Sequence, residues 1–477
     1  MVLPQEIKNI LSDLSKAGYE GYVVGGCVRD LMMKKTPKDW DVTTNARPEE
    51  IQKIFPEHIY ENTFGTVGVK TGSENESLAI VEITPYRIEG KYTDKRHPDE
   101  VKFAKTLKED LSRRDFTVNS LAMDVSGEIV DLFEGKKDIK SKLIRTVGKP
   151  EERFSEDSLR LLRAVRFASV LGFEIEDKTL KAVTNNSEWL KAISKERIRD
   201  EFVKIIESDN AYEGVLLLEE TGLLKYILPE LREGIDVGQN LHHIYTVWEH
   251  NTRALKYTVE KKYSLAVRLG ALLHDVGKPR TKRGDGKYST FYGHDVIGGK
   301  MTAEIMARLK FSNEITEKVI KLVRYHLFYY NVDEVTESSV RRLMVNVGPE
   351  NMEDLIKIRE ADRIGSGTPK AVPYKLRHLK YIIDKVSHDP ISAKMLKVSG
   401  EDVMKELGIK PGPKVGLILN SLLAEVIDDP TKNKKENLKK RIHELDKKSP
   451  EELKKALDRI EKAVEDEEKE RMKKYYV

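Results

Sequence analysis

The stretch "YVVGGCVRDLMMKKTPKDWDVTT", residues 22–44, decides the fold of the N-terminal part of this chain. Its apolar start predicts a strand that ends at the glycine pair Gly25 and Gly26, and "DWDVTT" predicts a second strand after a short helix. Residues two apart on a strand face the same side, so we expect Asp39 and Asp41 to project together. Two carboxylates held this close repel each other unless a cation lies between them, and oxygen ligands suit Mg²⁺.

The glycine pair supplies the second half of this predicted site. Without Cβ atoms, the backbone at Gly25 and Gly26 can approach a triphosphate closely and offer N–H groups, while Arg29 can reach the same oxygens. Mg²⁺ held by carboxylates and by substrate phosphates prepares a nucleoside triphosphate for attack by a hydroxyl. An Asp-x-Asp turn or a glycine pair alone is a weak signal, but their order within this short stretch favours a nucleotide site.

Length and composition bound the rest of the chain. At 477 residues the chain is too long for one core, and we expect two to four domains. The net charge of +4, from 84 basic and 80 acidic residues, is too small to indicate a polyanionic partner by itself. A single cysteine, Cys27, rules out an internal disulfide framework and predicts the cytoplasm. Because we find neither an apolar run of membrane-spanning length nor a signal peptide, we expect no membrane partner.

Strand patterns gather in the first third of the sequence. Residues 1–145 mix strand and helix patterns, whereas helical periodicity dominates after about residue 150. The segment "SEDSLRLLRAVRFASVLGF" (155–173) predicts one helix with Ser155 as N-cap and Asp157 in its first turn. We therefore expect the α+β class, with a mixed sheet and helices followed by an all-helical remainder.

Asp157 and Arg160 are three residues apart on this predicted helix and are expected to share one face. A carboxylate only accepts hydrogen bonds and a guanidinium only donates them. Cytosine and adenine both present an amine donor beside a ring-nitrogen acceptor, so both match this pair. Uracil and guanine present the reverse order and would leave mismatched, desolvated polar groups. The pair therefore predicts that the protein itself selects C and A.

Four ordered motifs resemble the class II tRNA nucleotidyltransferase and bacterial poly(A) polymerase superfamily. They are "GGCVRDLMMKKTPKDWDVTT" (25–44), "RRDFTVNSLAMD" (113–124), "EERFSEDSLRLLRAVRFA" (151–168) and "ISKERIRDEF" (193–202). The resemblance implies a palm in which Asp39 and Asp41 are the catalytic metal ligands, with Glu82 as a third carboxylate. It further implies a set of nucleotide-binding residues: Gly25, Gly26 and Arg29 at the phosphates, Asp115 at the ribose 2′-OH, Asp157 and Arg160 at the base, and Arg114, Asn119, Arg163 and Arg166 around the nucleotide.

The same resemblance implies template-independent addition of CCA to the 3′ end of tRNA, from CTP and ATP with Mg²⁺. Segment 87–111 is polar and hinge-like, and in the family such a loop is needed to switch from C to A. Its presence argues against an enzyme that adds only CC. Two alternatives stay open from the residues alone: a tRNA nucleotidyltransferase that adds only A, and a poly(A) polymerase. We expect the tRNA to be read by shape, through phosphate and 2′-OH contacts.

A second constellation resembles an HD domain. It is carried by "WEHNTRAL", "LAVRLGALLHDVGKPRT", "FYGHDVIGG", "VRYHL" and "READRIGSG", with the candidate metal ligands His250, His274, Asp275, His294, His326 and Asp362. Imidazole and carboxylate together favour a divalent transition metal or Mg²⁺. The resemblance implies either hydrolysis of phosphate esters or a domain that only supports the body. We expect four parts: a head (1–145), a helical neck and body (146–235), an HD domain (236–370) and a helical C-terminal region (371–477).

Overall fold

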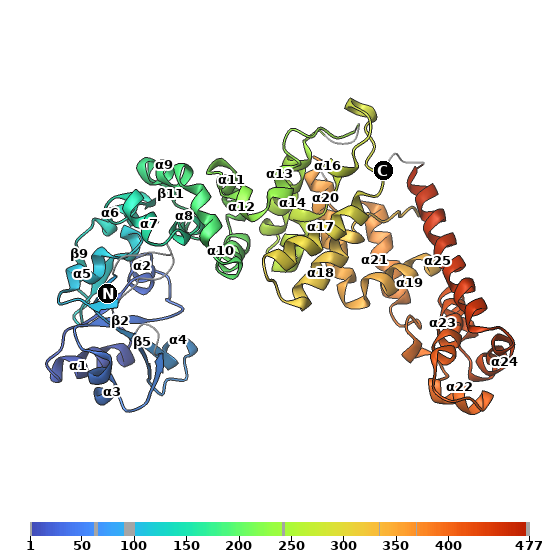
Figure 1. Ribbon diagram of the computed structural model, residues 1–477, viewed down its shortest axis with the longest axis horizontal. Helices are drawn as coiled ribbons and strands as arrows, with labels where there is room; N and C mark the ends of the chain where they lie inside the picture. The colour runs from blue at the N-terminus through green and yellow to red at the C-terminus, as the bar shows by residue number, and fades with distance from the viewer. Residues whose placement is uncertain are drawn as a thin grey trace. The chain divides into compact units, whose positions relative to one another are not determined.

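The computed structural model describes residues 2–61, 65–89, 101–240, 244–332, 334–368 and 370–473. The chain divides into two compact units, Met1–Pro229 and Glu230–Val477 (Figure 1). The first unit holds a mixed sheet followed by helices, and the described part of the second unit is built from helices. The predicted α+β class is therefore confirmed.

A seven-stranded sheet forms the centre of the head, in the order β3-β4-β5-β2-β1-β8-β9. Strands β2 and β5 run parallel, whereas the other neighbouring strands run antiparallel, so the sheet is mixed. The strands are β1 (Gly21–Val24), β2 (Asp41–Thr44), β3 (His58–Glu61), β4 (Thr66–Lys70), β5 (Ile80–Pro85), β8 (Leu121–Met123) and β9 (Ile129–Asp131).

Helices α1 (Gln5–Lys16) and α3 (Pro48–Ile54) pack against this sheet. The apolar residues of α1 recur at helical spacing and are buried in one core with Val23 of β1 and Val42 of β2. Burying one such side chain stabilises the fold by about 1.5–3 kcal/mol, so this core holds the strands that carry the site in place. The remaining helices of the head are α2 (Gly26–Met32), α4 (Glu76–Ala79), α5 (Leu107–Ser112) and α6 (Gly135–Ser141).

A separate hairpin pairs β6 (Arg87–Glu89) with β7 (Val101–Phe103). The loop predicted to serve the switch from C to A spans 87–111. Its residues 90–100 lie outside the described residues, so only its two flanks enter the structure.

The helix predicted over 155–173 is interrupted. Helix α7 (Pro150–Glu156) ends before Asp157, and α8 (Leu159–Leu171) follows, so Ser155 lies inside α7 and is not an N-cap. Pro150 at the first helical position starts α7 earlier than predicted. The Asp157 side chain then accepts a hydrogen bond from the N–H of Leu159 at 3.0 Å, an arrangement that competes with a continuous helix.

The rest of the first unit is mostly helical. A short parallel pair of β10 (Leu143–Ile144) and β11 (Glu174–Ile175) is the exception, so the prediction of an all-helical remainder after the head was wrong at Glu174–Ile175. The further helices are α9 (Asp177–Asn185), α10 (Lys195–Glu207), α11 (Ala211–Glu220), α12 (Leu224–Ile227) and, at the junction of the two units, α13 (Pro229–Arg232).

The helices of the second unit enclose two apolar clusters. One cluster joins α14 to α21, with Leu376 and Leu379 of α21 packed among residues of α14, α15 and α20, and the other joins α22 to α25. The helices are α14 (Val247–Glu260), α15 (Leu265–Leu273), α16 (Lys278–Thr281), α17 (His294–Arg308), α18 (Asn313–Arg324), α19 (Glu337–Val347), α20 (Met352–Gly365), α21 (Tyr374–Val386), α22 (Gly400–Leu407), α23 (Pro413–Asp428), α24 (Lys435–Asp446) and α25 (Pro450–Lys473).

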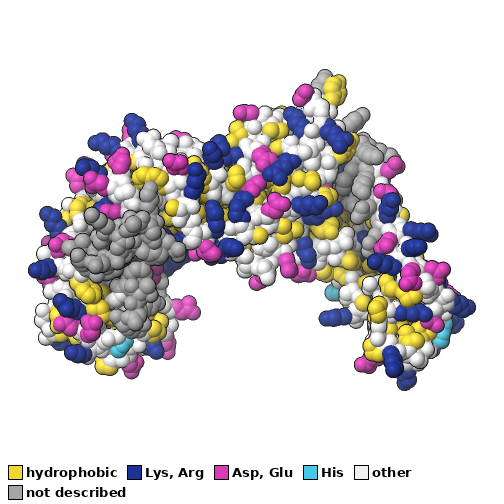
Figure 2. Space-filling view, viewed as in Figure 1, with side chains coloured by type: hydrophobic (Ala, Val, Ile, Leu, Met, Phe, Trp, Pro, Cys, Tyr) yellow, Lys and Arg dark blue, Asp and Glu magenta, His cyan; other side chains and the backbone are white. Residues whose placement is uncertain are grey.

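The surface reflects the near balance of 84 basic and 80 acidic residues. Figure 2 shows Lys and Arg interspersed with Asp and Glu over the visible face. Among the described residues, no helix combines the length and the apolar character needed to cross a bilayer.

Candidate functional site

Strand β2 places Asp41 directly beside Glu82 of β5 in the register of the parallel pair. Asp39 lies in an exposed bend before the strand, so the prediction that both acids belong to the strand was wrong for Asp39. The reason is that β1 ends at Val24, where the glycine turn begins, and leaves β2 without a partner on that side before Asp41. Asp39 nevertheless lies close enough to act on Asp41 electrostatically.

The charged form of the Asp41 carboxylate is disfavoured at this position. Burial is the main cause that raises its pKa to about 6; Glu82 and Asp39 add to the rise, and Arg114 opposes it. A divalent cation relieves such a cluster of acids, and their oxygens are the ligands that Mg²⁺ prefers. The acids at the start of β2 therefore fit a metal bound together with a nucleotide.

Gly25 turns the chain from β1 into α2 with a φ of +80°, a region that favours glycine. A Cβ atom here would lie 3.0 Å from Nη1 of Arg114 and 3.8 Å from Oδ2 of Asp41. Gly25 thus leaves room for a cationic side chain next to the acid. A Cβ atom on Gly26 would make only ordinary contact, 3.6 Å from Nη2 of Arg29, so the role of Gly26 at phosphate stays a prediction.

A polar network connects the first three of the four predicted motifs. Nη1 of Arg29 donates to Oδ1 of Asn119 at 2.6 Å, and Nε of Arg29 donates to Asp30 at 2.9 Å. The amide nitrogen of Asn119 donates to Oδ1 of Asp115 at 3.3 Å. Nε and Nη2 of Arg163 donate to Oδ2 of Asp115 at 2.8 and 2.6 Å. Residues from α2, from the segment after α5 and from α8 are therefore held as one unit.

Asp115 is kept ionised by this network. Burial opposes its ionisation, but the charge and hydrogen bonds of Arg163, with help from Arg160 and the N–H of Phe116, lower the pKa of Asp115. An ionised carboxylate only accepts hydrogen bonds, so it suits a hydroxyl donor such as a ribose 2′-OH. This chemistry supports the predicted role of Asp115.

The ring of Phe167 lies close to three arginines of the site. This residue was not predicted from the sequence. The guanidinium carbons of Arg29, Arg163 and Arg166 lie 5.6, 5.2 and 3.6 Å from the centre of its ring. The ring itself packs edge-on against Phe116 at 5.6 Å. Cations over an aromatic face are attracted to it, so Phe167 positions the guanidinium groups. The signal was present in the sequence as an aromatic residue inside an arginine-rich helix.

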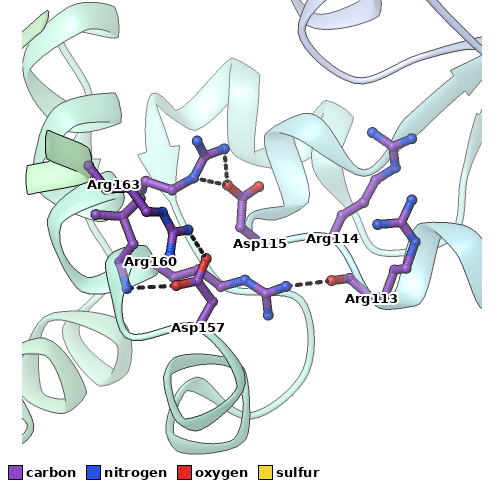
Figure 3. Close-up of a pocket in the computed structure, with 8 residues that line it drawn as sticks. Arg113, Arg114, Asp115, Asp157, Arg160 and Arg163 are labelled. Carbon is purple, nitrogen blue, oxygen red and sulfur yellow. Dashed lines mark hydrogen bonds and ion pairs between the residues drawn. The ribbon is translucent and has the colours of Figure 1, made fainter. Parts of the chain in front are cut away.

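A pocket of about 260 Å³ opens between these elements (Figure 3). It is lined by Arg113, Arg114, Asp115, Asp157, Leu159, Arg160, Arg163 and Arg197. Most of these residues were predicted to bind the nucleotide. The excess of arginine over aspartate in the lining suits an anionic ligand.

Asp157 and Arg160 both line the pocket, although they do not share a helix face as predicted. Asp157 lies at the break between α7 and α8, and its Oδ2 accepts a hydrogen bond from Arg197 of α10 at 2.8 Å. Arg160 donates to the carbonyl oxygen of Arg113 at 3.1 Å (Figure 3). It also donates to Glu156 at 2.5 Å. The break between α7 and α8 lets Asp157 and Arg160 line the same pocket, which helical spacing could not predict.

Arg166 differs from the other predicted arginines. Its Nε donates to Oε2 of the buried Glu201 on α10 at 2.8 Å, and it is not among the residues that line the pocket. In this structure Arg166 joins α8 to α10. Its predicted contact with the nucleotide stays a prediction.

In the second unit, the structure brings together all six predicted HD-type ligands. His250 lies on α14, His274 and Asp275 follow α15, His294 starts α17, His326 follows α18, and Asp362 lies on α20. We call these six residues the HD-type cluster. Asp275 is central. Its Oδ2 lies 3.1 and 3.4 Å from Nε2 of His250 and His274, and its Oδ1 lies 3.3 and 3.5 Å from Nε2 of His294 and His326.

The cluster offers two groups of metal-ligating atoms that share Asp275. One group is His250, His274 and Asp275, and the other is Asp275, His294 and His326. Asp362 adds an oxygen 3.4 Å from Nε2 of His250. Lys278, which sequence reasoning missed, places Nζ 2.6 Å from Oδ2 of Asp275. A lysine three residues after Asp275 lies one helical turn away, which was the available signal.

Hydrogen bonds to the backbone prepare three of these imidazoles as ligands. Nδ1 of His274, His294 and His326 each lies 2.7 Å from a backbone carbonyl oxygen three residues earlier. A carbonyl only accepts, so Nδ1 donates to it and Nε2 is the nitrogen left to bind a metal. Nε2 of His294 and of His326 faces Oδ1 of Asp275, and Nε2 of His274 lies 2.8 Å from Nε2 of His250. The arrangement fits a divalent cation between these atoms.

The protonation of His274 agrees with this fit. Burial, aided by the neighbouring His250 and His326, lowers the pKa of His274 to about 3, although Asp275 opposes the shift. His274 is therefore neutral near pH 7, the form that binds a metal.

Comparison with known proteins decides the family. The Poly A polymerase head domain matches residues 21–145, the RNA and SrmB-binding site of polymerase A matches 172–235, and tRNA nucleotidyltransferase domain 2 matches 296–442. The CCA-adding enzyme of Ligilactobacillus salivarius is 34% identical over 456 residues, which cover 93% of this chain and 98% of that protein. This chain belongs to the CCA-adding enzyme family.

Other CCA-adding enzymes agree with the assignment, and the resemblance expected from the four motifs is confirmed. The CCA-adding enzyme of Lactobacillus helveticus is 52% identical over 197 residues, which cover 41% of this chain and 48% of that protein. The crystal structure of the Bacillus stearothermophilus CCA-adding enzyme in complex with CTP superposes with a TM-score of 0.65 at 26% identity. That match covers 94% of this chain and 98% of the other.

Proposed function

We propose that the protein adds C, C and A to the 3′ end of tRNA from CTP and ATP, without a nucleic-acid template. One observation carries this proposal: the chain matches CCA-adding enzymes over nearly its whole length. Three of its four motifs also line one pocket, and Arg29 of the first motif is hydrogen-bonded to Asn119 of the second. The A-adding and poly(A) alternatives are not favoured by these relatives.

The head residues divide the work of nucleotidyl transfer. The 3′-hydroxyl of tRNA attacks the α-phosphorus of the bound nucleotide, a new P–O bond forms, and pyrophosphate leaves. Asp39 and Asp41, with Glu82 beside them, would hold a divalent cation such as Mg²⁺. When bound, the metal neutralises charge on the triphosphate and orients it for attack. Arg29 and Arg114 hold phosphate oxygens close to these acids.

Asp157 and Arg160 read the base by their opposite hydrogen-bonding capacities. Each carboxylate oxygen of Asp157 accepts more than one hydrogen bond, so Arg197 and the Leu159 N–H leave acceptor capacity for the amine of C or A. Arg160 turns an N–H group from its protein partners toward the ring nitrogen of the base. Arg197 is a positioning residue in this scheme, since it holds the Asp157 carboxylate.

The test uses tRNA that ends at the discriminator base, incubated with CTP alone, with ATP alone or with both. The expected product with both nucleotides is longer by three residues, and CTP alone should stop after two. A single added A would indicate the A-adding alternative, and a long A tail would indicate a poly(A) polymerase. Either result would contradict the proposed function.

A second candidate function is supported by the HD-type cluster. We propose that it binds divalent metal and hydrolyses phosphate esters. The cluster provides buried imidazole and carboxylate ligands around Asp275. When bound, metal in such a site activates water and polarises the phosphate. Purified protein should contain or bind a divalent metal, and p-nitrophenyl phosphate should be hydrolysed. Absence of both would leave a structural role for these residues.

The domain boundaries and the cellular compartment of the protein are also proposals. We propose a head at 1–145, a neck and body at 146–235, an HD domain at 236–370 and a helical C-terminal region at 371–477. The core shared by α21 with α14, α15 and α20 attaches the start of the last part to the HD domain. We propose the cytoplasm as the compartment, in keeping with the single buried cysteine.

A further inference from the structure

Asp110, in the last turn of α5, is a buried acid with an exposed fraction of 0%. We call the pocket shown in Figure 3 the nucleotide pocket. Asp110 does not line this pocket, and it is not among the residues predicted to bind the nucleotide or the metal. Burying a carboxylate is costly unless charged or polar partners compensate it. The partners of Asp110 therefore indicate what it does.

The two oxygens of Asp110 hold two different arginines. Nε and Nη2 of Arg113 donate to Oδ1 at 3.0 and 2.7 Å, and Nη2 of Arg114 donates to Oδ2 at 3.2 Å. The two arginines follow Asp110 by three and four positions, a spacing that brings side chains together at a helical turn. The backbone N–H of Arg87 in β6 adds a longer contact, 3.5 Å from Oδ1. Burial opposes the ionisation of Asp110, but Arg114 and Arg113 lower its pKa, so the group is an anion near pH 7.

Both arginines line the nucleotide pocket, and their side chains are mostly buried. The contact of Arg114 with Asp110 uses only Nη2. Nη1 of Arg114 lies at the glycine turn, 3.0 Å from the place that a Cβ atom on Gly25 would take. Nε of Arg114 is buried and has no hydrogen-bond partner among the residues that the structure describes. Asp110 thus holds one end of this guanidinium and leaves the other end for a ligand.

Arg113 connects Asp110 to the part of the pocket that is proposed to read the base. Its side chain is held by Asp110, and its carbonyl oxygen accepts a hydrogen bond from Nη2 of Arg160 at 3.1 Å. The carbonyl oxygen of Ser112, one residue earlier, accepts from Nη1 of Arg153 in α7 at 3.1 Å. An arginine that is already fixed in place loses little side-chain freedom when a ligand arrives, so the ligand binds more tightly.

We propose that Asp110 is a positioning residue for nucleotide binding: it holds Arg113 and Arg114 at the pocket and so sets the affinity for CTP and ATP. The proposal rests on the proposed nucleotide addition and adds to it a residue that does not touch the substrate. The alternative is that Asp110 is a rival anion, which must release the arginines before phosphate can bind. The burial of Asp110 favours the holding role, because release would leave a buried charge without its partners.

The first test measures the Kd of the full-length protein for CTP in EDTA, so that neither metal nor turnover contributes. Asp110→Asn keeps the shape of the side chain and removes its charge. We expect the Kd to rise by about fivefold or more, because two guanidinium groups must then be ordered on binding. With Mg²⁺ and tRNA, KM for CTP should rise by a similar factor and kcat should change less. An unchanged Kd would overturn the proposal, and a lower Kd would identify Asp110 as a rival anion.

Asp354→Asn is the matched control. Asp354 on α20 of the second unit is also a buried acid whose two oxygens contact two cations, Lys357 at 2.9 Å and Lys318 at 2.6 Å. It does not line the nucleotide pocket. This variant should lose stability in the same way and keep the wild-type Kd for CTP. An equal rise of the Kd in both variants would trace the effect to general destabilisation and overturn the proposal.

The second test asks whether Asp110 acts through its two arginines. In the double variant Arg113→Gln with Arg114→Gln, CTP binding is already weakened, and adding Asp110→Asn should change the Kd by less than about twofold. The added change should also raise the unfolding temperature, because Asp110 has no charged partner left in that background. A further loss of about fivefold or more would show that Asp110 acts by another route. This comparison decides the proposal even where Asp110→Asn alone fails to fold.

The proposed function and the role of Asp110 fail in different ways. A wild-type protein that binds CTP but does not extend tRNA by C, C and A would contradict the proposed function. The Kd values for CTP would still decide the role of Asp110, because they are measured without the reaction.

Discussion

The head site and the HD-type cluster balance their charges in different ways. In the head, acids are paired with arginines: Asp115 with Arg163 and Asp157 with Arg197. In the cluster, one oxygen of Asp275 faces Lys278, whereas its other oxygen faces Nε2 of His294 and of His326, whose Nδ1 atoms donate to the backbone. Arginine pairs can open for a ligand that arrives and leaves in every cycle. Imidazole nitrogens gathered around a buried carboxylate are instead a set of ligands that fits a divalent cation.

The largest expected effect is the loss of nucleotide addition in Asp41→Ala. Removal of an acid that holds the cation should slow addition by at least about 100-fold, because charge on the triphosphate is no longer neutralised. The measurement is addition of CMP to tRNA at saturating CTP, together with tRNA affinity, which should stay nearly unchanged. If the variant still added CMP at the wild-type rate, Asp41 would not be a metal ligand, and the head side of the comparison with the HD-type cluster would fail.

The next effect is expected in His294→Ala. This change removes one ligand from the cluster, so bound metal and phosphate-ester hydrolysis should fall by at least about tenfold. CCA addition should keep its wild-type rate, because a separate set of acids, Asp39, Asp41 and Glu82, is proposed to hold the cation of the head. Metal content by elemental analysis is the direct measurement, and His443→Ala on α24 is the control. Parallel loss of both activities would show that the two sites do not work independently.

Base selection should weaken in the variant that combines Asp157→Ala with Arg160→Ala. Each mismatched polar group is worth about 1–3 kcal/mol, so discrimination between CTP and UTP should fall by roughly 5–150-fold. Arg197→Ala should produce a smaller loss, because it only frees the Asp157 carboxylate to move. The measurement is the ratio of kcat/KM for CTP and UTP. If UTP is rejected as strongly as before, the protein pair is not what reads the base.

The smallest effect is a pH dependence of metal binding in the head. The pKa of Asp41 is about 6 in the folded, metal-free protein, against an ordinary value of 3.8. Below about pH 6 a proton therefore competes with the cation, and Mg²⁺ affinity should fall by about tenfold per pH unit. Without metal, this raised pKa makes the folded state less stable as the pH rises from about 4 to about 6. Mg²⁺ titrations of addition between pH 5.5 and pH 8 test the first expectation, and a flat profile would contradict it.

The sequence predicted the parts that depend on short segments. Asp41 and Gly25 lie close together in the chain, and the structure places both at the same turn. The six HD-type residues were also predicted together, since each belongs to a short local pattern. Such patterns identify residue types before the distances between them are known.

Other features depended on contacts between distant segments. Arg197 approaches Asp157 across 40 positions, and Phe167 gains its role only when α2 and α8 meet. Asp39 was misplaced because the end of β1, and not the strand-like pattern, decides where β2 begins. Helix periodicity likewise could not show that Asp157 would cap the break by bonding the N–H of Leu159. These features depend on contacts between distant segments, and on side chains that compete with helical hydrogen bonds of the backbone.

The break between α7 and α8 has one more consequence. A residue inside a helix can change only its side-chain rotamer, whereas Asp157 stands at a joint with an extended backbone, φ −137° and ψ 106°. The products differ in width, because cytosine has one ring and adenine has two. If Asp157 reads the base as proposed, a joint at this position would let the same carboxylate meet both the narrow base and the wide one in a single pocket.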